Sequence, residues 1–112
     1  MKFSKGTAKV RRIGPELTIY DIFVDPNANM DFVIAELNGN HPMVINYESD
    51  RIYFIIKGKG EVFSDNKWEN VVENDCVYIK KNTVHSIRGN LIYAIITAPP
   101  FNPQNESEKE EY

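Results

Sequence analysis

The chain has 112 residues, of which 42% are hydrophobic and 26% charged, a composition typical of one ordinary globular domain. A single cysteine, Cys76, excludes an internal disulfide framework, and no apolar run approaches the roughly 20 residues of a membrane span. The formal net charge of −3 hides a basic stretch at residues 1–12, which is too short to favour a nucleic-acid partner. With no secretory signal visible, we expect a cytoplasmic protein without membrane or nucleic-acid partners.

Strand signals dominate the chain. Stretches rich in β-branched and aromatic residues predict strands at residues 17–24, 32–37, 51–56, 71–79 and 91–97. Turn sequences that contain glycine lie between several of them, at residues 38–40, 57–60 and 88–90. No segment shows a convincing helical period with caps. Many short strands at nearly regular spacing therefore predict an all-β sandwich or barrel.

The composition changes after the last predicted strand. Residues 99–103 contain three prolines and are expected to be extended and outside any central strand. Residues 104–112 contain four glutamates and are expected to form a disordered acidic tail. The sequence therefore predicts one domain over residues 1–103, followed by the tail at residues 104–112.

The strand predicted at residues 51–56 is apolar on both faces. By alternation Tyr53 and Ile55 lie on one face, and Phe54 and Ile56 lie on the other. In a single-layered barrel one face fills the interior, so the opposite face needs a cover. The chain's own termini could fold across it, but a second copy is favoured because two-fold dimers are the commonest oligomers. We therefore expect a homodimer.

Two spaced motifs give the chain a family resemblance. The first motif reads Gly, five residues, His-x-His, three or four residues, Glu, six residues, Gly, and its positions here are Gly39, Ile45, Tyr47, Arg51 and Gly58. The second is matched in spacing at Asn74, Lys80, Asn82, His85 and Gly89. In these spacings the chain resembles the cupins, which are antiparallel jelly-roll β-barrels. The resemblance implies that fold with extended termini, core motifs at residues 39–60 and 74–90, and a hairpin at residues 58–60.

The same resemblance raises the question of a metal site. Metal-binding cupins use three histidines and one glutamate, at the positions held here by Ile45, Tyr47, Arg51 and His85. Only His85 matches, the chain contains two histidines in all, and an arginine places a fixed positive charge against any cation. A metal site displaced from these positions could draw on His41, Glu48, Asp50 and His85. Such a site is disfavoured, because strand alternation points Glu48 and Asp50 away from the face of Arg51. We expect no metal and no other cofactor.

The former ligand positions are still expected to converge in the barrel mouth and to bind a small polar or anionic ligand. Arg51 is predicted to anchor it, because a guanidinium group grips a carboxylate or phosphate with two hydrogen bonds. His85 and Tyr47 are predicted to contact the recognised end of the ligand, while Tyr53 and Ile45 line the wall.

Three functions stay open at this point. The favoured one is a binding or sensor protein without chemistry. The second, for which the resemblance supplies a precedent, is a metal-independent sugar isomerase or epimerase with His85 as base and Tyr47 as acid. The third is a structural subunit whose barrel is filled by ordinary packing. The pKa of His85 separates the first two, because a catalytic base titrates near the working pH and a buried histidine need not.

Overall fold

The computed structural model describes residues 1–109, which form nine strands and two short 3-10 helices. The elements are η1 (Lys5–Thr7), β1 (Lys9–Ile13), β2 (Leu17–Phe23), β3 (Asp31–Asn40), β4 (Val44–Asn46), β5 (Asp50–Ser64), β6 (Lys67–Val72), β7 (Cys76–Ile79), β8 (Ser86–Ala98), η2 (Pro103–Asn105) and β9 (Glu106–Glu108). The all-β prediction is confirmed.

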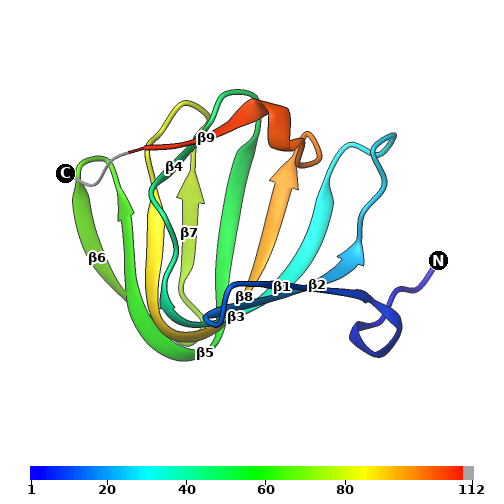
Figure 1. Cartoon of the computed structure of the whole chain (residues 1–112), viewed down its shortest axis with the longest axis horizontal. Coiled ribbons are helices and arrows are strands. Elements are labelled where there is room, and N and C mark those ends of the chain that lie inside the picture. Colours follow the sequence, from blue (N-terminus) through cyan, green and yellow to red (C-terminus); the bar gives the residue numbers. More distant parts are fainter. Residues whose placement is uncertain (110–112) are drawn as a thin grey trace.

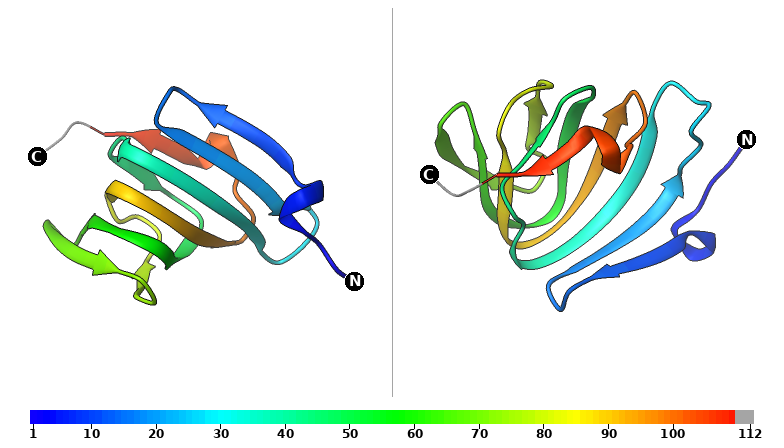
Figure 2. Two further views of the ribbon diagram at one scale, coloured as in Figure 1. Left: turned by 90° about the horizontal axis from the view of Figure 1, so that it is seen from below. Right: turned by 45° about the horizontal axis from the view of Figure 1, so that its top comes forward.

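Seven of the strands form one antiparallel sheet in the order β1-β2-β3-β8-β5-β6, with β7 paired to the first half of β5. The sheet curls into a cup that is not strictly closed (Figure 1). The remaining two strands, β4 and β9, form a separate small sheet. It lies along the rim of the cup in both views of Figure 2, so the C-terminal segment borders the open side.

The core fills the inside of the cup through strict alternation along the strands. In β3, for example, Val33, Ala35 and Leu37 are buried while the residues between them are only half-buried. The strand register places Ala35 opposite Tyr93, which lies opposite Ile55, so inward side chains form layers across the sheet. Burying each large apolar side chain contributes about 1.5–3 kcal/mol, and this layered core is what holds the cup in shape.

The three glycine segments predicted as turns lie inside long strands instead. Gly39 of β3 pairs with Gly89 of β8, which also pairs with Gly60 of β5, so three glycines form one row across the sheet. A Cβ atom at Gly89 would lie 2.6 Å from the Cα atom of Gly60, and the φ angle of Gly89 is +132°, which L side chains rarely adopt. The hairpin expected at residues 58–60 is therefore wrong. Glycines permit a close approach of the strands here, and β5 continues round the base of the cup (Figure 1).

The acidic end of the chain differs from the disordered tail expected of it. Residues Glu106–Glu108 form β9 and pair with β4 in antiparallel register. The composition gave no sign of this because the stabilising partners, the backbone of β4 and the side chain of Arg51, lie far away in the sequence. Residues 110–112 of the predicted tail lie outside the described residues. Within the described part of the chain, no helix is long and apolar enough to cross a membrane.

Candidate functional site

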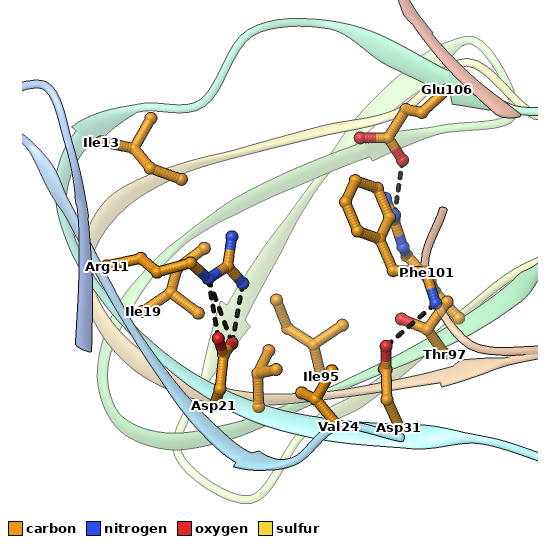
Figure 3. A pocket seen from close by; sticks show the side chains of 12 residues that line it. Arg11, Ile13, Ile19, Asp21, Val24, Asp31, Ile95, Thr97, Phe101 and Glu106 are labelled. Atoms are coloured by element: carbon orange, nitrogen blue, oxygen red, sulfur yellow. Dashed lines mark hydrogen bonds and ion pairs between the residues drawn. The ribbon is translucent and has the colours of Figure 1, made fainter. Parts of the chain in front are cut away.

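A cavity of about 280 Å³ lies inside the curve of the sheet (Figure 3). One part of its lining is apolar and consists of Ile13, Ile19, Val24, Val33, Ile95 and Phe101. The other part is polar and consists of Arg11, Asp21, Asp31, Arg51, Thr97 and Glu106. A concave site with an apolar wall and a few convergent polar groups is the usual form of a small-molecule site.

The strand register explains why three of the polar groups meet. Asp31 of β3 lies opposite Thr97 of β8, and Thr97 lies opposite Arg51 of β5. Directly opposed residues on neighbouring strands place their Cβ atoms about 5 Å apart on the same face of the sheet. Asp31, Thr97 and Arg51 therefore form a polar row, and all three are buried.

The carboxyl group of Asp31 is almost completely buried, since the residue is 3% exposed. Its Oδ2 atom accepts a hydrogen bond of 2.9 Å from the backbone N–H of Phe101, as Figure 3 shows. Burial raises the pKa of Asp31 above its ordinary value, although the hydrogen bonds from Phe101 and Thr97 and the charge of Arg51 oppose this shift. The carboxyl group is thus satisfied on one side and open to the cavity that it lines.

Arg51 is surrounded by partners on two sides. Its Nη2 atom forms an ion pair with Oε1 of Glu106 at 2.5 Å, and its Nη1 atom lies 3.1 Å from Nε2 of His85. The guanidinium group also lies 5.5 Å from the centre of the Phe101 ring. Within residues 1–109, the buried Nε atom of Arg51 has no hydrogen-bond partner. Tyr53 also forms a side-chain hydrogen bond with Arg51, so the guanidinium group is fixed in position and its Nε–H is closed off from solvent.

His85 holds Arg51 rather than facing the cavity. The residue is 1% exposed, and its Nδ1 atom lies 2.8 Å from the carbonyl oxygen of Thr83, which can only accept. Nδ1 therefore carries the proton, and the lone pair of Nε2 accepts from Arg51. Burial lowers the pKa of His85 to about 4, so the ring is neutral near pH 7. With its lone pair engaged, the ring is not available as a general base.

Tyr53 belongs to the core beneath this row. Its ring lies 5.4 Å from that of Tyr93 and 6.3 Å from that of His85, and burial raises the pKa of its hydroxyl group. Tyr53 is not among the residues that line the cavity. Of the residues that the sequence singled out, the structure thus brings Arg51, His85 and Tyr53 together, and Arg51 alone lines the cavity.

Tyr47 and Ile45 lie elsewhere. Tyr47 is 46% exposed, and hydrogen bonds with Ser107 and Lys109 lower the pKa of its hydroxyl group. Ile45 is half-buried and pairs with Ser107 in the small sheet. The structure therefore does not assemble the acid–base pair of His85 and Tyr47 that the isomerase alternative requires.

Asn46 explains why Tyr47 does not converge with Arg51 as the sequence analysis expects. Its Oδ1 atom accepts hydrogen bonds from the backbone N–H groups of Glu48 at 3.0 Å and Ser49 at 2.7 Å. The turn that results resets the side-chain alternation before β5 begins. Residues on the two sides of a turn need not share a face, so Tyr47 and Arg51 diverge.

The residues at the former metal positions do not fit a metal ion. Three of them are Ile45, Tyr47 and Arg51, and the guanidinium group of Arg51 occupies the lone pair of His85. His41, the other histidine, points Nδ1 at the carbonyl oxygen of Pro42 at 2.8 Å. Across residues 1–109, no three His, Cys, Asp or Glu side chains are grouped so that they could hold a metal. No chemistry through a metal is derived for this site.

The sequence did not point to several of the residues that line the cavity. Asp31 and Thr97 carried a usable signal, because each is a polar residue in phase with the buried residues of an apolar strand. Arg11 and Asp21 also lie on the inner side, where they form an ion pair with contacts of 2.8 to 3.1 Å (Figure 3). Glu106 carried no such signal, since only the pairing of β9 with β4 places it in the cavity wall.

The comparisons with known proteins give fold matches only. No family model and no curated protein matches the sequence. A variant of Streptomyces PAC13 with uridine has a TM-score of 0.87 at 19% identity, covering 98% of this chain and 90% of that one. KdgF from Halomonas sp. has a TM-score of 0.79 at 12% identity, covering 93% of this chain and 97% of that one. A predicted oxalate decarboxylase from Thermotoga maritima has a TM-score of 0.77 at 16% identity, covering 88% and 98%.

The chain has the cupin fold. The resemblance read from the two spaced motifs is confirmed at this level, and so is the antiparallel jelly-roll architecture. At these identities the matches establish the cupin fold alone. The fold alone does not identify a ligand, which depends on the residues that line the cavity of this chain.

Proposed function

We propose that this cupin binds a small polar ligand in the cavity beside the polar row. The observation that carries the proposal is the two-sided lining, with Asp31, Thr97 and Arg51 on one side and Ile95 and Phe101 among the apolar residues on the other. A volume of about 280 Å³ lies just below the roughly 300–1,000 Å³ usual for ligand sites, which suits a molecule of the size of a sugar or nucleoside.

The available hydrogen-bonding groups suit hydroxyl and carbonyl groups on such a molecule. The carboxyl group of Asp31 can accept from a ligand hydroxyl, and Arg51, whose Nη1 and Nη2 atoms each carry two N–H groups, can donate to a ligand oxygen. The flat face of a ring would pack against Phe101 and Ile95, burying apolar surface at about 25 cal/mol per Å². The fold neighbour PAC13, described as a nucleoside dehydratase, was solved with uridine, so uridine is a suitable first probe.

The cavity and its surroundings also favour one of the three functions that the sequence leaves open. A purely structural cupin would have its barrel filled, and the open space beside Asp31 speaks against that. The isomerase alternative needs His85 as a free base next to Tyr47. His85 is engaged with Arg51 and Tyr47 is exposed outside the cavity, so binding without assigned chemistry is the function that the geometry supports best.

The test is a titration of the ¹⁵N-labelled protein with uridine, and separately with ribose, followed by NMR. We expect shifts at Thr97, Phe101 and Ile95, and a loss of affinity of tenfold or more in Asp31→Asn, which keeps the size of the side chain. Asp65→Asn is the matched control, because Asp65 lies exposed in the turn before β6, outside the cavity lining. If neither probe shifts these cavity residues at about 10 mM, where even weak binding is visible, the proposal is wrong.

We also propose that two copies of the chain pair through the outer face of β5, β7 and β8. Phe54 is 40% exposed and Tyr78 is 58% exposed on this face, and the register places Phe54 opposite Ala94 and Ile52 opposite both Ile96 and Tyr78. Ile52, Phe54, Ile96 and Tyr78 are uncharged, and the carboxylate of Asp50 at the start of β5 accepts a hydrogen bond of 2.9 Å from the hydroxyl group of Tyr78. A second copy can therefore cover the apolar positions while this carboxylate stays at the rim of the interface. The N-terminal residues do not serve as the cover, since their contacts run to β2 and β3, through Phe23, Tyr20 and Glu36.

Light scattering behind size-exclusion chromatography tests this pairing. We expect a dimer for the unchanged chain and a monomer for Phe54→Asp. Tyr47→Asp is the control, because it places the same charge on an equally exposed aromatic residue at the rim of the cup. A monomeric unchanged chain at about 100 μM, or a dimer that survives Phe54→Asp, would overturn this part of the proposal.

A further inference from the structure

The positive charges in the cavity lining are already matched by carboxylates. Arg11 is paired with Asp21, and Arg51 is paired with Glu106. The lining also contains a third carboxyl group, that of Asp31, so its carboxyl groups outnumber its two guanidinium groups. Among the lining residues, no guanidinium group is therefore left without a carboxylate, so the cavity lacks the unpaired cation that an anionic ligand needs.

Glu106 is held firmly against Arg51 by the strand that carries it. Its Oε1 atom also accepts from Nδ2 of Asn46 at 3.3 Å. Beside it, the backbone N–H of Tyr47 donates to Asn105 at 2.8 Å and that of Lys109 donates to Met43 at 2.8 Å. The pairing of β9 with β4 fixes the backbone of Glu106, so a ligand anion has to compete with the ion pair to Arg51 and the hydrogen bond from Asn46.

The ion pair leaves one kind of contact open. Arg51 directs one N–H of Nη1 to His85 and one of Nη2 to Glu106, so further Nη–H groups remain, whereas Nε is buried out of reach of a ligand. A single N–H can satisfy a hydroxyl or carbonyl oxygen, whereas a carboxylate or phosphate is bound best by two parallel N–H groups of an unpaired guanidinium group. An anion placed here would also face the carboxylate of Glu106 at short range in a site of low dielectric constant.

We infer that Glu106 is a specificity-determining residue, whose carboxylate neutralises Arg51 so that the cavity accepts uncharged polar ligands and rejects anions. This inference rests on the proposed binding function and narrows its ligand class. It also reverses the role expected of Arg51 from the sequence. Arg51 alone would anchor an anion, but Arg51 with a fixed carboxylate partner donates a hydrogen bond without offering net charge.

The test replaces the charge and keeps the shape. Inorganic phosphate is titrated into the ¹⁵N-labelled unchanged chain, Glu106→Gln, Glu108→Gln and the double variant Arg51→Gln/Glu106→Gln. Glu108→Gln is the matched control, because it removes the same charge from the same strand at an exposed position. We expect Glu106→Gln to bind phosphate at least tenfold more tightly than the unchanged chain, with shifts at Thr97 and Phe101. Glu108→Gln should behave as the unchanged chain, and the double variant should lose the gain.

The amide signals of Tyr47 and Lys109 report whether β9 stays in place in Glu106→Gln. A detached strand would still leave Arg51 unpaired, so the gain in phosphate binding is expected in either case, and its absence overturns the inference. Equal phosphate binding by the unchanged chain and Glu106→Gln overturns it as well. Uridine binding by the unchanged chain is measured separately. If uridine and ribose fail while Glu106→Gln gains phosphate, the proposed function fails and the role of Glu106 in excluding anions stands.

Discussion

His85 should make the free energy of unfolding of this protein depend on pH between about 4 and 6.5. Burial lowers the pKa of His85 from its ordinary value of 6.5 to about 4 in the folded chain. Between these two values the unfolded chain binds a proton at this position and the folded chain does not. Stability must therefore fall as the pH falls from 6.5 towards 4, and this penalty is absent above pH 6.5.

The size of the effect follows from the shift. Each pKa unit corresponds to about 1.4 kcal/mol, so the full window amounts to about 3 kcal/mol and the part above pH 5 to about 2 kcal/mol. Domains of this size are stable by about 5–15 kcal/mol, so such a loss is easily measured. His41, whose pKa burial also lowers, acts in the same direction and has to be separated.

Urea unfolding of the unchanged chain and of His85→Gln at pH 7 and pH 5 makes the separation. The unchanged chain is expected to lose about 2 kcal/mol more than the variant over this interval, because contributions from His41 and the carboxyl groups are common to both. Even if His85→Gln is less stable at both pH values, its smaller change with pH carries the result. If the two proteins lose the same free energy, or if NMR shows His85 titrating near 6.5, the neutral, Arg51-bound state of the ring is wrong.

Two further predictions concern the frame that positions the site. Gly89→Ala should destabilise the fold by about 2–5 kcal/mol, since its Cβ atom would lie 2.6 Å from the Cα atom of Gly60, whereas Gly6→Ala, with open space around it, should change urea stability by less than about 0.5 kcal/mol. Asn46→Ala should lower the free energy of unfolding by about 1–3 kcal/mol in the same assay, because it leaves the backbone N–H of Ser49 without its acceptor. Asn70→Ala, at an exposed position of β6, is the control. Equal losses of stability in the two variants would refute the role given to Asn46.

The all-β architecture followed from local sequence signals, and the exceptions have identifiable physical causes. Residues 58–60 and 88–90 have the composition of turns, because glycine serves both a reversal of the chain and a close approach of two strands. Only the pairing of Gly60 with Gly89, 29 positions apart, distinguishes the two uses. Local sequence carries no information on that pairing.

The candidate site was predictable in part for the same reason. Arg51 and Tyr53 lie on one strand, so alternation placed both of them on the buried face correctly. Tyr47 lies beyond a turn, where alternation loses its meaning. Glu106 belongs to a segment whose composition is typical of disorder, and its burial depends on a partner 55 positions earlier in the chain.

The position of β9 has a consequence for a chain that is shortened at its C-terminus. The large sheet ends with Ala98 of β8, whereas Phe101 and Glu106 of the cavity wall follow it in the sequence. A chain cut after β8 would therefore retain every strand of the large sheet and lose the carboxylate that pairs with Arg51. On the role proposed for Glu106, such a chain would present a cationic pocket in place of a neutral one.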